Sequence, residues 1–574
     1  METQLSQFFG ALNAEEKEFI PTLAADKLGL ILRSAVNELD WYYYNMSRSE
    51  SPTPEQEEEF YLLQLGVARL LKLSLEARPS FDVPTVTFRR EGGITLPVLK
   101  IAGGLGMIEH GRRIAQTVSA GLCNIRRTGE NEFLIILPSV IPDDEYDERA
   151  VSEHYRAESR RSFAQLLQSD YGRKLEADVN KRLKELVYVF AAHFIGYDAD
   201  PLLDDYFFGI AFSEVQLYEG YDTFHYAAHF GGIPFEKYIL ALTYFISISM
   251  RHERFAESLV EKDPSVKLEN VLTISSETEG FVESIKDAIN HFGSAYANFE
   301  DATLEDARRI FEVLSFSRRN TALLARPASP LPLMIQCSDH DFIRCLTGAR
   351  TSSMQFLLDS LRHHFPDDYD RHQQSREKAM QTAIKRVLNG CFAGLGYLEN
   401  IKIKLEGRVL TDIDLIVTEE ASGTVFLCQL KHQELYGADI HSRHIRTKRL
   451  KDQSSRWFAS LDDWIGAVGQ DGIRASLRLP KTFPPISVYR FVISRHYSYP
   501  LRDLVQSADK GHANWPQFVN SIELIKKEKP NGRKLIDLVA TLRKTAVSAG
   551  RQEHLPEPRS EWVIRNLKFT VMQQ

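Results

Sequence analysis

Residues 411–431, TDIDLIVTEEASGTVFLCQLK, combine two apolar runs with acidic, amide and basic side chains. A polar turn that contains a glycine separates the runs, so we expect two adjacent strands. Side chains alternate between the faces of a strand, and Asp412 and Asp414 therefore share one face. For the same reason, Gln429 and Lys431 share a face of the second strand. Burying a carboxylate and an ammonium is costly unless they meet each other, a metal or a ligand, so the pattern predicts a site.

The order of these residues resembles the core of a known enzyme superfamily. The sequence has an Asp, then a gap of about fifteen residues, then Gln, any residue and Lys. This order is similar to the motif of the PD-(D/E)xK nucleases, in which Glu or Gln precedes the Lys by two positions and whose fold is that of restriction endonucleases. The family also has an acidic residue on a preceding helix, for which Glu377 in a helix expected from Ser375 is the candidate. A Gln on the helix after the Lys has its candidate in Gln453. The resemblance covers residues 375–457, with looser support to 494.

The resemblance implies a set of site residues and a cofactor. The implied catalytic residues are Asp414, Gln429, Lys431 and Glu377, and the implied metal ligands are Asp414, Gln429, Glu377 and Asp412. The expected ion is Mg²⁺ or Mn²⁺, because such hard cations take oxygen ligands and keep several waters. The ion would polarise the phosphate and lower the pKa of the attacking water. Lys431 would orient that water or neutralise charge in the transition state.

Three features depart from the family pattern. Gln429 stands where Glu is commoner, and a neutral amide is a weaker ligand than a carboxylate. Asp412 and Asp414 compete for the principal ligand position, and the spacing to Gln429 favours Asp414 because it suits a simple strand-turn-strand. The stretch from Glu377 to Asp414 is long for this motif, and Gln381 lies one helical turn after Glu377.

A basic segment follows the candidate lysine. Residues 441–451, HSRHIRTKRLK, contain five cations and no acidic residue. Directly after a nuclease lysine, such a run is expected to hold nucleic-acid phosphates near the metal, although alone it would be a solvated face. The predicted nucleic-acid-binding residues are Arg443, Arg446, Lys448, Arg449, Lys451 and Gln453. Trp457 is predicted to anchor this helix in the core rather than to stack on a base.

The charge of the chain is divided unevenly along its length. Residues 371–574 carry 33 Lys and Arg against 21 Asp and Glu, a balance of +12. Residues 1–370 carry 37 against 57, a balance of -20, so the whole chain has a net charge of -8. Phosphate backbones are bound chiefly by Lys and Arg, so nucleic acid, with DNA favoured, is the expected partner of the C-terminal part. An acidic partner or simple solubility would also account for the division.

Length and composition predict a multidomain globular protein. The chain has 574 residues, 43% of them hydrophobic and 26% charged, and no run of 18 or more apolar residues. A cytoplasmic protein without membrane segments is expected. The five cysteines have no C-x-x-C spacing and are expected to be reduced thiols in cores.

The fold expected is multidomain α+β, with a mostly helical N-terminal region, a small β-containing insert and a C-terminal α/β/α restriction-endonuclease-like domain. The predicted divisions are a helical segment at 1–82, a β-containing segment at 83–145, a helical domain at 146–330, a connector at 331–370 and the nuclease-like domain at 371–574. Strands are predicted at 86–90, 95–101 and 133–137, and helices at 205–218, 236–253, 278–291 and 304–318. The glycines at 103, 104 and 106 are interpreted as a tight turn from strand to helix rather than a phosphate loop.

Two functions from different classes follow. The first is a metal-dependent endonuclease that hydrolyses phosphodiester bonds, in the layout of a defence-type effector. Its acidic helical N-terminal region would sense a signal, form homo-oligomers or bind a protein partner. The second is a scaffold protein whose nuclease-like domain holds DNA or a partner without cutting. The presence of Asp, Gln and Lys together favours the first.

Overall fold

The structure is a computed structural model of the whole chain. It describes residues 3–573 except 24–26, 50, 79–89, 122, 138–160, 162–163, 166, 192–193, 217–222, 328, 434–439, 506 and 549–558. The predicted strand at 86–90 and the division at 145/146 therefore lie wholly or mostly outside the described residues. The described chain combines many helices with several small sheets, as the expected α+β class requires.

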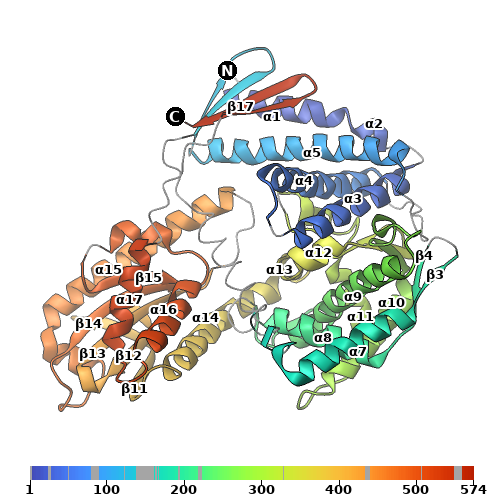
Figure 1. The fold of residues 1–574 in the computed structure, drawn as a ribbon. Coiled ribbons are helices and arrows are strands. Elements are labelled where there is room, and N and C mark those ends of the chain that lie inside the picture. The colour runs from blue at the N-terminus through green and yellow to red at the C-terminus, as the bar shows by residue number, and fades with distance from the viewer. Residues whose placement is uncertain are drawn as a thin grey trace.

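Buried apolar residues divide the chain into two lobes (Figure 1). One core takes its residues from 8–369 and again from 564–569, and we call this part the N-terminal lobe. Two further cores, from residues 380–542 and 403–501, lie in what we call the C-terminal lobe. The helix α14 (Pro366–Asn389) runs from the first lobe into the second.

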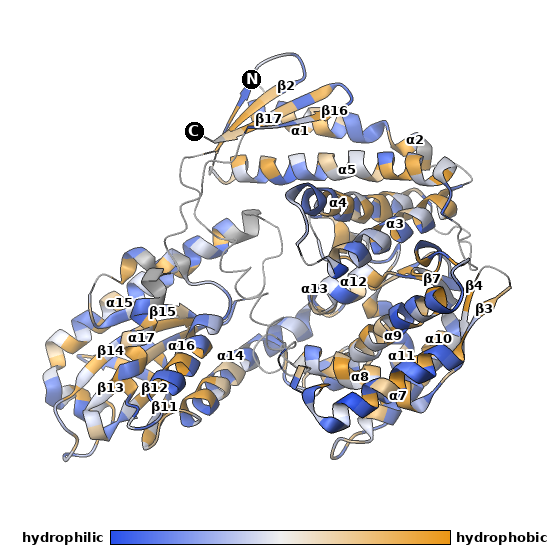
Figure 2. Ribbon diagram, viewed as in Figure 1, coloured by the Kyte–Doolittle hydropathy of each residue, from blue (hydrophilic) through white to orange (hydrophobic). Residues whose placement is uncertain are grey.

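The N-terminal lobe is mostly helical. Its helices are α1 (Gln4–Lys17), α2 (Ile20–Leu23), α3 (Leu28–Arg48), α4 (Pro54–Ala77), α5 (Gly92–Ser119), α7 (Asp170–Leu186), α8 (Pro201–Gln216), α9 (Phe235–Lys262), α10 (Thr278–Gly293), α11 (Leu304–Leu314), α12 (Leu346–Thr351) and α13 (Ser353–His364). Figure 2 shows hydrophilic and hydrophobic residues alternating along α5 and α7, as expected where one helix face covers a core. The four helices predicted between 205 and 318 are present as α8 to α11, but α11 ends at Leu314, and Ser315–Phe316 form the strand β8.

Short sheets complete this lobe. The strands are β1 (Asn124–Arg127), β2 (Glu132–Leu137), β3 (Val187–Phe190), β4 (Phe194–Tyr197), β5 (His229–Phe230), β6 (Ile233–Pro234), β7 (Ile274–Glu277), β8 (Ser315–Phe316), β9 (Met334–Gln336), β10 (Asp341–Arg344), β16 (Ser560–Ile564) and β17 (Leu567–Gln573). Two sheets have four strands, in the orders β1-β2-β17-β16 and β7-β10-β9-β8. The predicted strand at 133–137 is confirmed as β2.

The strand predicted at 95–101 is wrong, because these residues belong to the helix α5. The glycines that follow also lie inside this helix rather than in a turn. A Cβ at Gly106 would lie 2.1 Å from the carbonyl oxygen of Leu62 on α4, and a Cβ at Gly66 would lie 1.8 Å from that of Ala102. The glycines therefore let α4 and α5 cross with their backbones in contact, a use that local sequence pattern does not reveal.

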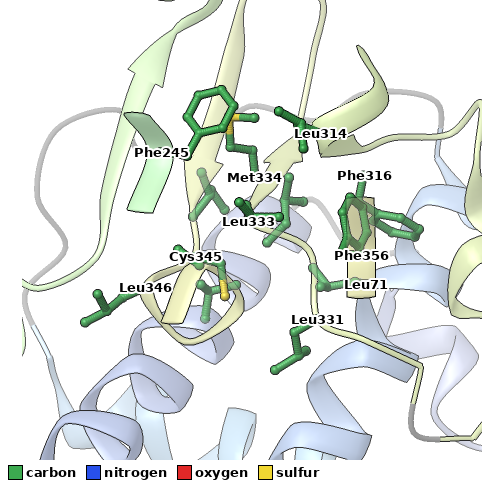
Figure 3. Close-up of a cluster of buried hydrophobic side chains, with 14 of the residues drawn as sticks. Leu71, Phe245, Leu314, Phe316, Leu331, Leu333, Met334, Cys345, Leu346 and Phe356 are labelled. Carbon is green, nitrogen blue, oxygen red and sulfur yellow. The ribbon is translucent and has the colours of Figure 1, made fainter. Parts of the chain in front are cut away.

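The connector predicted at 331–370 is instead part of the N-terminal core. Leu331, Leu333 and Met334 are at most 4% exposed. Figure 3 shows them packed with side chains from distant helices and strands, among them Leu71 and Phe356. The prolines before this segment mark an extended stretch, but its apolar residues pair and pack rather than link two domains.

The C-terminal end of the chain returns to the N-terminal lobe. β17 pairs with β2 in parallel, and Phe569 is fully buried against Phe8 of α1. The last domain therefore does not extend to residue 574 as predicted, and its described part ends with α17 (Leu535–Ser548). Residues 371–548 still carry 29 Lys and Arg against 18 Asp and Glu, so the basic charge stays with the C-terminal lobe.

The C-terminal lobe is built on one five-stranded sheet. Its strands are β11 (Leu395–Leu405), β12 (Arg408–Glu419), β13 (Thr424–Lys431), β14 (Ser487–Ser494) and β15 (Lys510–Asn514), in that spatial order. The first three strands are antiparallel, and β13, β14 and β15 are parallel. The turn between β12 and β13 ends at Gly423, which has a φ of 67° and therefore suits a glycine.

Helices cover both faces of this sheet. The helix α14, together with α16 (Trp515–Glu528) and α17, packs on one face, and α15 (Ile440–Ser476) packs on the other. α14 begins at Pro366, nine residues before the predicted start, because Pro at the first position and Asp367 and Asp368 in the first turn favour a helix N-terminus. α15 kinks at Gly469.

Among the described residues, no helix is both long enough and apolar enough to span a membrane. The five cysteines are buried and free, as the sequence predicts for reduced thiols.

Candidate functional site

The pairing of β12 with β13 brings the two halves of the predicted motif together. Leu415 pairs with Cys428, so the antiparallel register places Asp414 directly across from Gln429. The Nε2 of Gln429 donates to Oδ2 of Asp414 at 2.5 Å, and both side chains are buried, with 3% and 6% exposure. The predicted contact between the two strands is therefore present in the fold.

The ladder between β12 and β13 ends at this point. Its last pair is Leu415 with Cys428, and beyond it the Asp414 side chain takes the place of a backbone partner. Oδ2 of Asp414 accepts the backbone N–H of Leu430 at 2.6 Å. The backbone pairing of the strands can end here without leaving the N–H of Leu430 unpaired.

Gln381 holds the backbone of the candidate aspartate. Its Nε2 donates to the carbonyl oxygen of Asp414 at 2.8 Å and to Oδ1 of Asn400 at 3.0 Å. The sequence suggested Gln381 only as an alternative to Glu377. Its side chain instead ties α14 to β11 and β12, so that the helix and the strands keep one geometry around Asp414.

Glu377 lies one helical turn earlier on α14 and is half-buried. Burial is the largest cause of the raised pKa of Asp414, and the charge of Glu377 raises that pKa further. The neighbouring Arg376 is buried in the other direction, over the ring of Phe224 in the N-terminal lobe. α14 therefore contacts the N-terminal lobe through Arg376.

Burial raises the pKa of Asp414 to about 7. The N–H of Leu430 and the ammonium of Lys431 lower this pKa, whereas the charges of Glu377 and Asp412 raise it. Neighbouring carboxylates raise one another's pKa when no nearby cation offsets their negative charges. A cation beside Asp414 would favour its ionised form.

Asp412 and Asp414 have different surroundings although they share a strand face. Asp412 is exposed, whereas Asp414 is 3% exposed. The backbone carbonyl of Asp412 accepts the indole N–H of Trp457 at 2.9 Å. Trp457 is itself buried, so the residue anchors α15 against β12. This is the role that the sequence analysis assigned to it.

Lys431 stands at the end of β13 and opens onto a pocket. This pocket has a volume of about 330 Å³. Its lining residues are Arg362, Gln373, Lys431, His432, Gln433, Arg446, Arg449, Leu450, Gln453 and Tyr497. Four of these are cations, and none of the described lining residues is acidic. Lys431 therefore lines a basic pocket and lies two positions after Gln429 on the same strand.

The predicted nucleic-acid-binding residues of α15 separate into three groups. Arg446, Arg449 and Gln453 line the pocket beside Lys431. Lys448 lies with Arg449 along a second groove of about 380 Å³. Lys451 donates to the Asp503 carboxylate at 2.9 Å, so its charge is already paired. The side chain of Arg443 lies outside the described residues.

Protein-family models, curated proteins and solved structures give no significant match to this chain. The functional argument therefore rests on the residues and contacts of the chain itself.

The donor set fits a hard divalent cation in chemical type. Asp414 and Glu377 supply carboxylate oxygens, and Gln429 carries an amide oxygen. In the described part of the chain, no three His, Cys, Asp or Glu side chains converge closely enough to hold a metal by themselves. A metal beside Asp414 would take the amide of Gln429, backbone oxygens or waters as further ligands. Because the Gln429 amide presents its N–H₂ to Asp414, it must turn about its terminal bond to offer that oxygen.

Sequence reasoning missed several residues around Lys431. Gln433 follows Lys431 by two positions, a spacing that could have marked it. Arg362, Gln373 and Tyr497 carry no such signal. They reach the pocket from α13, from α14 and from the segment after β14, and only the folded chain brings these segments together.

Proposed function

We propose that the protein is a metal-dependent nuclease whose C-terminal lobe has a restriction-endonuclease-like fold and hydrolyses phosphodiester bonds of nucleic acid, with DNA the favoured substrate. The observation that carries the proposal is the position of Asp414 across from Gln429 at the point where β12 and β13 separate. Lys431 stands at the same end of the sheet and lines a basic pocket.

The order of elements supports the proposed fold. A helix, three antiparallel strands, a second helix and a parallel strand follow one another as α14, β11, β12, β13, α15 and β14. Helices lie on both faces of the sheet, so the layers are helix, sheet and helix. This is the arrangement that the PD-(D/E)xK resemblance implies for these residues.

The residues of the site have separate tasks in the proposed reaction. Asp414, Glu377 and the Gln429 amide would hold the cation, and a bound cation would supply a water of lowered pKa and polarise the phosphate. Lys431 neutralises charge that develops on the phosphate in the transition state. The cations of α15 hold the strand, because Arg and Lys bind phosphate oxygens without reading sequence.

A second candidate function is a scaffold that holds nucleic acid without cutting it. The specific observation in its favour is the hydrogen bond from the Gln429 amide to Asp414. This bond satisfies the buried carboxylate with a neutral donor. A protein that never takes up a metal would be stable with this arrangement.

Cleavage assays distinguish the two functions. Plasmid DNA and single- and double-stranded DNA and RNA are incubated with the protein and Mg²⁺ or Mn²⁺. We expect metal-dependent cleavage, and we expect Lys431→Ala to lower the rate by about a hundredfold or more, because it removes stabilisation of developing charge. Lys481→Ala is the matched control. This exposed lysine precedes β14 at the opposite end of the sheet, since β13 and β14 run in parallel. Binding of every substrate without cleavage of any would favour the scaffold.

A further inference from the structure

The pocket beside Lys431 is shared by the two lobes. Arg362 belongs to α13, whose neighbours Leu361 and Phe356 are buried in the N-terminal core. Arg446 and Arg449 belong to α15 of the C-terminal lobe, and all three line the same cavity. We infer that this pocket binds a backbone phosphate of the nucleic-acid strand, next to the phosphate that is cleaved, and that Arg362 lets the N-terminal lobe take part in substrate binding. The inference rests on the proposed function for the identity of the strand.

Arg362 is held in place by an aromatic ring. Its guanidinium lies over the ring of Tyr369 at 4.4 Å from the ring centre. Arg376 lies over the same ring at 5.1 Å and donates to the Tyr369 hydroxyl at 3.1 Å. Tyr369 is 1% exposed, so both contacts lie on a rigid base. A guanidinium that stacks in this way is held in one plane, so it loses little entropy when its charge meets a phosphate.

The back wall of the pocket is also ordered. Oε1 of Gln433 accepts the backbone N–H groups of His496 and Tyr497 at 3.1 and 2.9 Å, and its Nε2 donates to the carbonyl of Tyr497 at 3.0 Å. Gln433 is 8% exposed. These bonds join the end of β13 to the segment after β14, so the shape of the pocket does not depend on a ligand.

The charge of the pocket selects its ligand. Arg362, Lys431, Arg446 and Arg449 converge on about 330 Å³, and the described lining residues include no Asp or Glu. A phosphate group meets such a set with charge-assisted hydrogen bonds, several of them from planar guanidinium groups. Lys431 lies two positions after Gln429 on β13, so a phosphate at Lys431 lies next to the candidate metal site. A strand that crosses both positions therefore presents consecutive phosphates to them.

The test measures binding without cleavage. Fluorescence anisotropy follows labelled single- and double-stranded oligonucleotides bound to the full chain without divalent metal, between about 50 and 200 mM salt. We expect Arg362→Ala to weaken binding roughly tenfold and to reduce the slope of log affinity against log salt by about one contact. Arg362→Lys keeps the charge and should restore most of the slope. Arg319→Ala, which removes an exposed arginine of the same lobe paired with Glu312, should leave both quantities unchanged.

Each outcome decides the inference. Thermal unfolding of the variants separates lost binding from lost folding, since Arg362→Ala also removes a stacking contact. Wild-type binding and slope in a folded Arg362→Ala variant would overturn the inference, whatever the protein cleaves. Arg362-dependent binding in a protein that cleaves nothing would uphold the inference and reject the nuclease function.

Inorganic phosphate is the second probe. Strong Arg362-dependent binding of phosphate alone, with oligonucleotide binding unaffected by the variant, would overturn the assignment to a strand.

Discussion

Two buried aspartates, one in each lobe, show what distinguishes a structural carboxylate from a candidate functional one. Asp40 of α3 is fully buried, and Asp414 of β12 is 3% exposed. Burial raises the pKa of both carboxyl groups. The raised pKa therefore does not separate them, and the difference lies in what surrounds each one.

Asp40 is surrounded by donors. It accepts the backbone N–H groups of Leu346 and Thr347 at the start of α12, and the hydroxyls of Thr273 and Thr347. Arg33 is 1% exposed, and burial lowers its pKa to about 10. The charge of Asp40 opposes this shift. The donors and the buried cation leave no use for a further ligand, so Asp40 serves to join α3, α12 and the segment at 273.

Asp414 has fewer donors and more acids around it. It accepts one amide N–H from Gln429 and one backbone N–H from Leu430. Glu377 and Asp412 act on it with like charge. Lys431 acts on it with opposite charge and also lines a pocket. The comparison teaches that incomplete compensation beside a cavity, rather than burial, marks the candidate site.

The largest effect is expected from neutralising the structural aspartate. Asp40→Asn should lower the free energy of unfolding by roughly 3–5 kcal/mol, because Arg33 would keep a buried charge without its partner. The N–H₂ group of the new Asn would also face the backbone N–H groups of Leu346 and Thr347, and two donors cannot pair. Denaturant unfolding of the full chain measures the change.

The same substitution at the other aspartate is the control. Asp414→Asn removes a carboxylate that the fold holds among like charges, so its stability should equal or exceed that of the wild-type protein near neutral pH. A loss of stability at Asp414 as large as that at Asp40 would remove the distinction between them.

The candidate site was more predictable than the N-terminal lobe. Asp414, Gln429 and Lys431 are joined by two neighbouring strands and one short turn, so alternation of side chains along the sequence is enough to bring them together. The α4–α5 crossing at Gly66 depends on a helix that the local pattern assigned to a strand. The contact between β12 and β13 is local in the sequence, whereas the crossing of α4 and α5 is not.

Long-range contacts also explain the other differences. β17 pairs with β2 across more than four hundred residues of chain, and no pattern within either strand names its partner. The segment 331–370 carries prolines at its start, and its burial depends on helices far away in the sequence. Arg362 was not predicted for the same reason, since its relation to Lys431 exists only after the two lobes meet.

A second prediction compares the two aspartates of one strand. Asp414→Asn should weaken Mn²⁺ binding by about a hundredfold or more and abolish cleavage, because a hard cation loses its principal anionic oxygen. Asp412→Asn should do less, since Asp412 is exposed and acts on the site only by its charge. Calorimetric titration of Mn²⁺ into both variants gives the ranking. Weaker binding by Asp412→Asn than by Asp414→Asn would make Asp412 the principal ligand.

The smallest effect concerns pH. The affinity for a metal ion should depend on the ionisation of Asp414 and not on that of Asp40. Asp414 has a folded pKa of about 7, whereas an unfolded chain ionises an Asp at about 3.9. The proton that Asp414 keeps in the folded state therefore contributes to the free energy of unfolding. This contribution is fully present below the unfolded pKa and is lost as pH rises through the folded pKa. Metal binding has the opposite sign, because a cation must displace that proton.

We therefore expect Mn²⁺ affinity to rise roughly tenfold per pH unit up to pH 7 and to level off above it, as measured by calorimetry between about pH 5.5 and 8.5. Asp412→Asn should keep this profile with its midpoint at lower pH, because the charge of Asp412 raises the pKa of Asp414. An affinity that does not change with pH in this range would mean that the ion does not meet the Asp414 carboxylate, and the buried acid would then be as structural as Asp40.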